Sequence, residues 1–147
     1  MNTTSIFARH CDIVGDDYTV LIRVAASYFD SFTLAWPSAG EFTGSLHKTA
    51  QDLQGHELGK EQDMTLYRLD AASVSVLHRR GSLFAWRLPE FPKDLTFYRD
   101  RGGRAGFTSS ADHVSAFILD AEFCRALPQQ LGFVEERMAA RTRKRIE

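Results

Sequence analysis

The sequence predicts a single α+β domain over residues 1–147, built from an antiparallel sheet of five to seven strands with two to four helices packed on one face. Three observations predict this fold class. The length is ordinary for one domain, and hydrophobic and charged residues make up 44% and 25% of the chain, as in globular proteins. Several short segments alternate apolar and polar residues with the period of a strand, while others space apolar residues three and four apart, as helices do. No internal repeat or shift in composition marks a second domain.

The first two strands are expected at 18–24 and around Phe32, Leu34 and Trp36, because apolar side chains occupy every second position in both segments. The few residues between them suit a turn, which predicts an antiparallel pair. Pro37 ends the second strand because it lacks an amide donor.

A helix is expected over 43–54, where apolar residues lie four and three positions apart and Thr43 or Ser45 suits the N-cap. The charged segment 56–63 is expected to be a surface loop.

A strand at 64–69 should follow that loop. A helix at about 70–80, capped by Asp70, comes next, although two valines within it also suit a strand. Alternating apolar residues predict a central strand at 83–88.

The glycine-rich stretch after this segment predicts a hairpin. Pro89 and Pro92 should carry the chain out of the sheet, since neither donates a backbone hydrogen bond. Strand character returns at 95–99, residues 100–103 supply the positive backbone angles of a tight reversal, and a return strand runs through Phe107.

The C-terminal third is expected to hold a strand at 113–119 and helical structure from 120 to about 142, which Asp120 caps. Pro128 suits the first turn of a second, basic helix over 129–147. Arginines recur every four residues in it, and like charges at that spacing repel, so the helix should be partly frayed.

Charge and composition exclude several classes of protein. A formal net charge of −1 argues against a protein that coats nucleic acid. The N-terminus lacks the features of a signal or transit peptide and no apolar run is long enough to span a membrane, so a cytoplasmic protein without a membrane partner is expected. Cys11 and Cys124 lack CxxC spacing and are expected to be free thiols.

Known metal and nucleotide motifs are also missing. His56-Glu57 begins like the helical zinc-protease motif, but Lys60 stands where a second histidine ligand is required. The five histidines are scattered, no GxSxG or GxxxxGK[ST] segment occurs, and the glycines of the predicted hairpin lead into a strand instead of a helix N-terminus. We therefore expect neither a metal nor a cofactor.

One group of residues has the types that acid-base chemistry needs. Acids, a histidine and two further polar side chains lie on or beside the predicted hairpin: Asp94, Tyr98, Arg99, Asp100, Asp112 and His113. A carboxylate beside an imidazole orients a general base, so His113, Asp94 and Asp112 are catalytic candidates. The same residues also suit a polar rim that contacts a partner, or turns and caps.

The segment around this hairpin resembles a group of small bacterial proteins. The similarity lies in a W-x-x-P-x-x-P-x-D-L-x-F-Y-R-D pattern followed by a glycine turn, here Leu83, Trp86, Pro89, Pro92, Asp94, Leu95, Phe97, Tyr98, Arg99, Asp100 and Gly103. It covers about a third of the chain. The Asp112-His113 pair departs from the His-Glu pair that ends the pattern in that group. Small α+β proteins of this kind are frequent among toxin-immunity proteins, which is an analogy of class.

These observations favour a protein that acts by contact. The leading hypothesis is a small bacterial protein-binding module, in its specific form an immunity-type inhibitor that occludes a toxin with acidic and aromatic residues on the helix-free face of the sheet. The expected contact residues are Glu57, Glu61, Asp63, Glu90, Asp94, Tyr98, Arg99 and Asp100.

Two alternatives stay open. The first is a small acid-base hydrolase that uses His113 with a nearby carboxylate. The second is a nucleic-acid-associated regulator that uses Arg137, Arg141 and Arg145, a role that the net charge disfavours.

Overall fold

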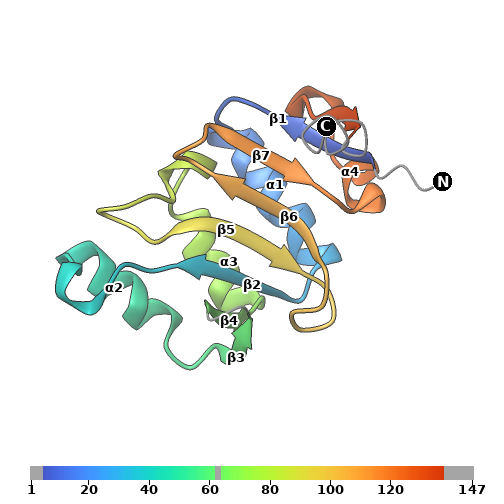
Figure 1. Ribbon diagram of the computed structural model, residues 1–147. Helices are drawn as coiled ribbons and strands as arrows, with labels where there is room; N and C mark the ends of the chain where they lie inside the picture. The colour runs from blue at the N-terminus through green and yellow to red at the C-terminus, as the bar shows by residue number, and fades with distance from the viewer. Residues whose placement is uncertain (1–4, 62–63, 138–147) are drawn as a thin grey trace, which may run out of the picture.

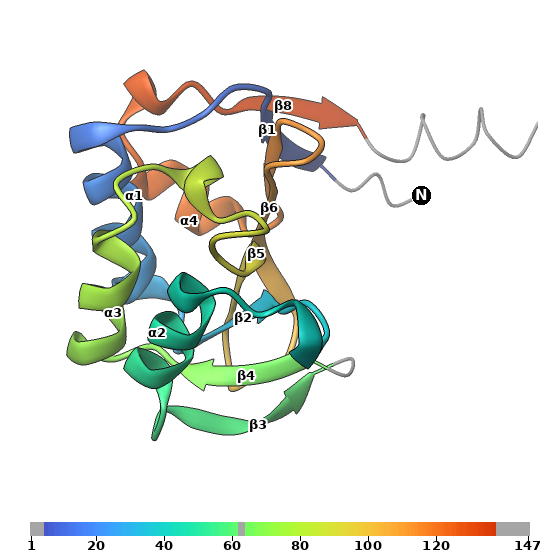
Figure 2. The ribbon, with the colours of Figure 1, turned by 90° about the vertical axis from the view of Figure 1, so that its left-hand side faces the viewer.

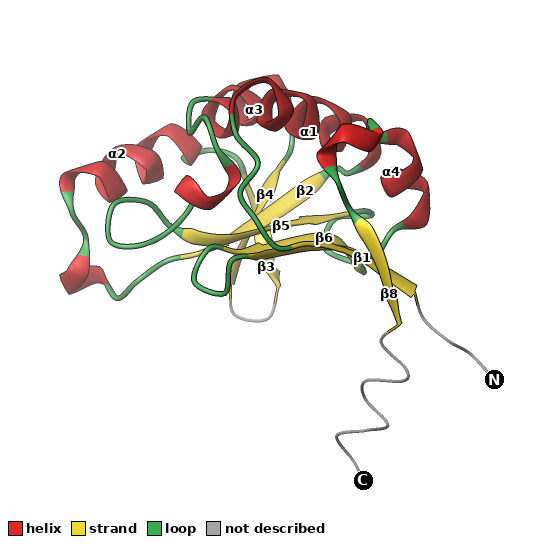
Figure 3. Cartoon of the chain, turned by 90° about the horizontal axis from the view of Figure 1, so that it is seen from above, coloured by secondary structure: helices red, strands yellow, loops and turns green. Residues whose placement is uncertain are grey.

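The computed structural model describes residues 5–61 and 64–137, which form one antiparallel sheet with four α-helices on a single face (Figure 1). The strand order is β3-β4-β2-β5-β6-β7-β1-β8. In Figure 3 the helices lie together above the sheet, and no helix of the described chain covers the face below. The predicted fold class is thereby confirmed, but the sheet has eight strands instead of five to seven.

The elements have the following bounds. The strands are β1 (Ser5–Arg9), β2 (Ser31–Ala35), β3 (Glu57–Glu61), β4 (Met64–Arg68), β5 (Lys93–Tyr98), β6 (Ala105–Ser110), β7 (Ser115–Ile118) and β8 (Val134–Arg137). The α-helices are α1 (Gly15–Tyr28), α2 (Gly44–Leu53), α3 (Ala71–His78) and α4 (Ala121–Ala126).

One row of large side chains crosses six strands beneath the helices. The strand registers place its members opposite one another, in the order Phe7, Ile118, Phe107, Phe97, Phe32 and Tyr67. All six belong to the hydrophobic core or pack against it. This inner row fixes the registers, because a slip of one residue would turn these side chains to the other face.

The next row points to the helix-free face and has different chemistry. It runs through Ala8, Phe117, Thr108, Thr96, Thr33 and Leu66. Three threonines lie at the centre of this row, in the same strands that contribute phenylalanines to the inner row. Seen from the side in Figure 2, the sheet twists strongly between β3 and β8, with the helices on one side of it.

The predicted strand at 18–24 is wrong, because this segment lies within α1. Its buried side chains are Tyr18, Leu21, Ile22 and Ala25, which have helical spacing. Several β-branched residues also produce an alternating pattern in this segment, and that pattern favoured the strand interpretation.

The predicted central strand at 83–88 is also wrong. Leu83–Ala85 form a short 3-10 helix, and Leu83 and Trp86 are buried together because they lie three residues apart. The Leu83 amide donates to the carbonyl of Ile13, so this segment passes over the start of α1 instead of joining the sheet.

The charged segment at 56–63 is not a loop over its described part, since 57–61 form edge strand β3. Edge strands commonly carry charged side chains, so the segment lacks the apolar alternation of an inner strand.

The C-terminal helix prediction is wrong as well. Helix α4 ends at Ala126, Gln129–Leu131 form a 3-10 turn, and β8 follows as a strand paired with β1. Gly132 makes the change of direction with a φ of 74°. Arg137 therefore lies in a strand, and the rest of the predicted basic helix, 138–147, lies outside the described residues.

Three predicted helix starts are confirmed by their caps. Thr43 accepts a hydrogen bond from the Leu46 amide, Asp70 forms a reciprocal capping box with Ser73, and the Asp120 carboxylate accepts from the Phe123 amide. The hairpin between β5 and β6 is confirmed too.

The reversal of that hairpin has positive φ at Asp100, Arg101 and Gly102, but not at Gly103. The carboxylate of Asp30 holds it by accepting from the Arg101 amide at 2.9 Å.

Candidate functional site

A groove of about 680 Å³ lies on the helix-free face of the sheet, along β5 and β6. Thr96, Tyr98 and Thr108 line it from the two strands. The hydroxyls of Thr96 and Thr108 are hydrogen-bonded to each other at 2.9 Å. The volume is that of a typical ligand or side-chain pocket. The structure thus hollows the face on which the sequence predicted a site.

Different elements line the two ends of the groove. Asp94, Ser110 and His113 lie where β5 begins and β6 ends, whereas Arg104 and Leu119 lie at the opposite end. Glu61 and Met64 reach it from the β3–β4 hairpin. A Cβ atom placed on Gly102 would be only 2.9 Å from Glu61 Oε1, so the β5–β6 turn lies directly against that hairpin.

Some predicted site residues are brought together and others are not. The groove collects four of them: Glu61, Asp94, Tyr98 and His113. Glu90 and Asp112 line a separate pocket. Glu57 accepts a hydrogen bond from the Gly55 amide on the outer strand β3, and Asp63 lies outside the described residues.

Arg99 and Asp100 lie elsewhere. The Arg99 guanidinium bonds to Asp120 at 2.7 Å and to Glu122 at 3.2 Å, and it lies over the rings of Tyr28 and Phe29. These contacts attach β5 to α4, which gives Arg99 a structural role. Asp100 belongs to the hairpin reversal.

Asp94 occupies a β-bulge. In the pairing of β2 with β5, Thr33 lies opposite Thr96 and Ala35 lies opposite Lys93, so β5 carries one extra residue between these pairs. Asp94 takes a φ of 62°, a left-handed conformation that glycine favours. Bulges of this kind re-aim a side chain, and here the bulge residue belongs to the lining of the groove.

The Asp94 carboxyl is half-buried, and its Oδ1 atom has no hydrogen-bond partner. Burial raises the pKa of Asp94 above its ordinary value and Asp112 adds to this rise, while Lys93, His113 and a hydrogen bond with Ser110 act against it. Burying a carboxylate without a full set of partners costs free energy. Strain, burial and a missing partner therefore coincide at one residue of the groove.

His113 is not arranged as a general base. Its side chain is exposed, and Nδ1 lies 2.9 Å from the hydroxyl of Ser110 within the same turn. Among residues 5–61 and 64–137, no carboxylate hydrogen-bonds to this ring. A base needs such a partner to fix its tautomer and orientation.

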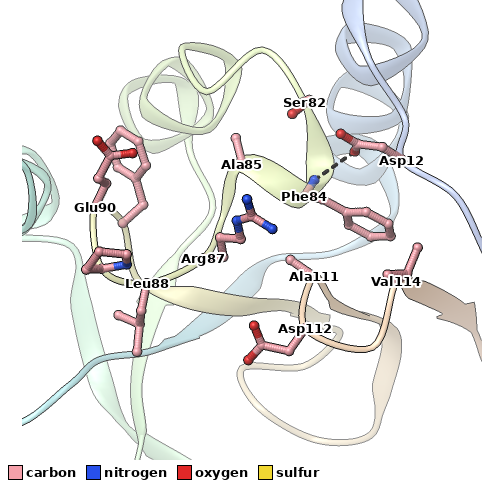
Figure 4. Close-up of a pocket in the computed structure, with 12 residues that line it drawn as sticks. Asp12, Ser82, Phe84, Ala85, Arg87, Leu88, Glu90, Ala111, Asp112 and Val114 are labelled. Atoms are coloured by element: carbon pink, nitrogen blue, oxygen red, sulfur yellow. Dashed lines mark hydrogen bonds between the residues drawn. The ribbon is translucent and has the colours of Figure 1, made fainter.

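The second pocket, of about 700 Å³, lies between the segment 82–91 and the β6–β7 turn. Figure 4 shows the Arg87 side chain in its middle, with Glu90 and Asp112 on different sides. Asp12 closes one wall by accepting a hydrogen bond from the Phe84 amide at 2.8 Å.

Sequence reasoning missed the residues between the two ends of the groove. Thr96 and Thr108 alternate with buried phenylalanines in their strands, and that alternation was the available signal. No sequence pattern marks Leu119 or Met64 as a groove residue, because only the packing of distant segments brings them to the groove.

Two further expectations concern the cysteines and the membrane. Cys11 is an exposed free thiol and Cys124 a half-buried one. Within the described ranges, no helix combines the length and apolar character needed to cross a membrane.

Replacing Asp94 by glycine should raise the free energy of unfolding by about 1 kcal/mol, because glycine adopts the left-handed conformation without strain. Urea unfolding monitored by circular dichroism measures the change. Asp112→Gly is the matched control, since Asp112 has ordinary backbone geometry and is paired with Lys93. It should be destabilising. A loss of stability in Asp94→Gly would contradict the assignment of strain.

The gain in stability from Asp94→Asn should depend on pH. A folded-state pKa above the unfolded value means that the favourable contribution of Asp94 is complete below the unfolded pKa and is lost as pH rises through the folded pKa. The amide variant should thus gain on wild type as the pH rises from about 3.8, the ordinary aspartate value. Lys93, Asp112 and His113 are the charged or titratable neighbours. Urea titrations at several pH values test this, and a difference independent of pH would refute it.

The resemblance of the hairpin segment to small bacterial proteins stays a prediction. No family model matches this chain, and no curated protein or solved structure matches it.

Proposed function

We propose that this protein is a protein-binding module whose partner docks on the helix-free face of the sheet. The observation that carries the proposal is the groove on that face, which gathers Glu61, Asp94 and Tyr98. The other face is filled by the core and covered by helices. Docking sites combine apolar surface with a few placed polar groups, and the groove has both kinds of lining.

The two edge strands of the sheet are poorly suited to pair with a strand of the partner, which favours docking on the face of the sheet. Edge strand β3 carries Glu57, Lys60 and Glu61, and edge strand β8 carries Glu135 and Glu136. Charged side chains on edges oppose pairing with another chain. A partner therefore gains more from the groove than from either edge.

The specific form of the proposal is an immunity-type inhibitor. An acidic and aromatic surface discriminates between partners and raises association rates toward a basic active site. Under this form, the partner is a toxin whose active site the groove face occludes.

Photo-crosslinking in cells of the native host tests the docking face. p-Benzoylphenylalanine in place of Leu119, which is 43% exposed and lines the groove, should crosslink to one defined protein. The same residue in place of Thr108 should give the same adduct. Substitution at Ala72, an exposed position on α3, is the control and should not give it. Adducts formed only from Ala72, or no adduct at all, would reject the proposal.

The inhibitor form has its own test. The crosslinked partner should slow growth when expressed alone, and co-expression of this protein should restore growth. If the partner is not toxic, the inhibitor form is rejected, and the proposal of a protein-binding module stands.

A further inference from the structure

We propose that the partner inserts a basic side chain, lysine or arginine, into the groove and pairs it with the carboxylate of Asp94. This inference rests on the proposed function and specifies the chemistry of the partner. It stands on the strained bulge that places Asp94 in the lining of the groove and on the enclosed Oδ1 atom, which has no partner among the described residues.

The neighbouring cation and the neighbouring imidazole are already engaged. Lys93 Nζ donates to the carboxylate of Asp112 at 3.2 Å, and the Nδ1 atom of His113 lies 2.9 Å from the Ser110 hydroxyl. Oδ1 of Asp94 is enclosed and has no donor among the described residues, although Ser110 lies close enough to lower the pKa of this carboxyl by hydrogen bonding. A cation that enters the groove would pair with the carboxylate once the side chain turns to present Oδ1, and this pairing would offset the cost of burial.

The lining also favours a long basic side chain over a metal ion. Among the described residues, no group of three or more His, Cys, Asp or Glu side chains could hold a metal ion. The groove instead offers apolar surface from Met64, Tyr98 and Leu119. Lysine and arginine bury their methylene stems against such surface while the charged head reaches an acid. The opposite end carries Arg104 beside the carboxylate of Glu61, so a cation gains more at the Asp94 end, where no arginine lines the groove.

The strain at Asp94 supports a binding role over a structural one. Glycine would fit the bulge better, and an apolar residue would avoid burying a charge. Residues held in costly conformations with unsatisfied groups cluster at ligand-binding sites.

NMR titration with N-acetyl-arginine amide tests the cation site directly. We expect saturable shifts of the backbone amides of Asp94, Thr96, Ser110 and His113. N-acetyl-citrulline amide has the same shape without the charge and should leave these signals unshifted. Asp94→Asn, which tolerates the same backbone conformation, should weaken binding of the arginine amide about tenfold or more, as loss of a charged hydrogen bond does. Glu90→Gln, an acid outside the groove, should bind like wild type.

Equal shifts with arginine and citrulline amides, or unchanged binding to Asp94→Asn, would overturn the inference. The crosslinked partner separates this failure from failure of the proposed function. If Asp94→Asn still captures that partner through Leu119, the docking face stands and the cation site is rejected. If wild type captures no partner, the proposed function itself fails.

Discussion

Replacing Trp86 by alanine should lower the free energy of unfolding by about 3–5 kcal/mol, the largest single loss that we expect in this protein. The indole is 1% exposed and its Nε1 donates to the Tyr18 hydroxyl at 2.9 Å. That hydroxyl donates to the carbonyl of Leu77 at 2.5 Å, and burial raises the pKa of Tyr18, which keeps the donor protonated. The indole thus ties the segment after the 3-10 helix to α1 and α3.

The variant removes a buried ring and one of the two hydrogen bonds of the Tyr18 hydroxyl. The Arg80 guanidinium, which lies 5.6 Å from the Trp86 ring centroid, also loses its cation–π contact with the indole. Urea unfolding by far-ultraviolet circular dichroism measures the loss without relying on tryptophan fluorescence. Trp36→Ala is the control and should cost less, because Trp36 is only half-buried where it packs against the core and stacks on Phe42. Equal losses in the two variants would contradict the central role of Trp86.

Replacing Gly106 by alanine should cost about 1–3 kcal/mol through overpacking. Gly106 is buried in β6, and a Cβ atom there would overlap the ring of Phe29 and approach the Cβ of Asp120 to 3.2 Å. Phe29 has little room to retreat, since it stacks on Phe97 at 5.8 Å and meets the edge of Phe123 at 4.9 Å.

The same change at Gly44 is the matched control, because a Cβ at the start of α2 would meet no atom within 4 Å. Gly44→Ala should be neutral or slightly stabilising, as alanine has the higher helix propensity. Thermal unfolding of both variants gives the comparison, and a neutral Gly106→Ala would show that the Phe29 ring moves aside at little cost.

Local signals predicted the elements whose boundaries are set by local chemistry. Thr43, Asp70 and Asp120 cap helices wherever they lie in the fold, and the glycine-rich reversal after β5 forms a turn for similar reasons. The segments 18–24 and 83–88 were predicted wrongly because a run of six or seven apolar and polar residues fits more than one period.

The site was predicted only in part, for a physical reason. Asp94 and His113 were chosen for their residue types, and both line the groove. The bulge that strains Asp94 depends on the register between β5 and β2, and these strands are about sixty positions apart in the chain. The hydrogen bonds of Arg99 with Asp120 and Glu122 likewise depend on tertiary structure, because they form only when α4 packs beside the end of β5.

Phe97 alternates with Thr96 in β5, and Phe107 alternates with Thr108 in β6. Each strand therefore carries two sets of residues, one that builds the core and one that lines the groove. Phe97 and Phe107 must fit the interior, so their replacement endangers folding. Thr96 and Thr108 line the groove, and a library randomised at these two positions would diversify the groove surface while sparing the layer of phenylalanines. Deleting a single residue from either strand would exchange the two sets, so diversification must proceed by substitution and never by a change of strand length.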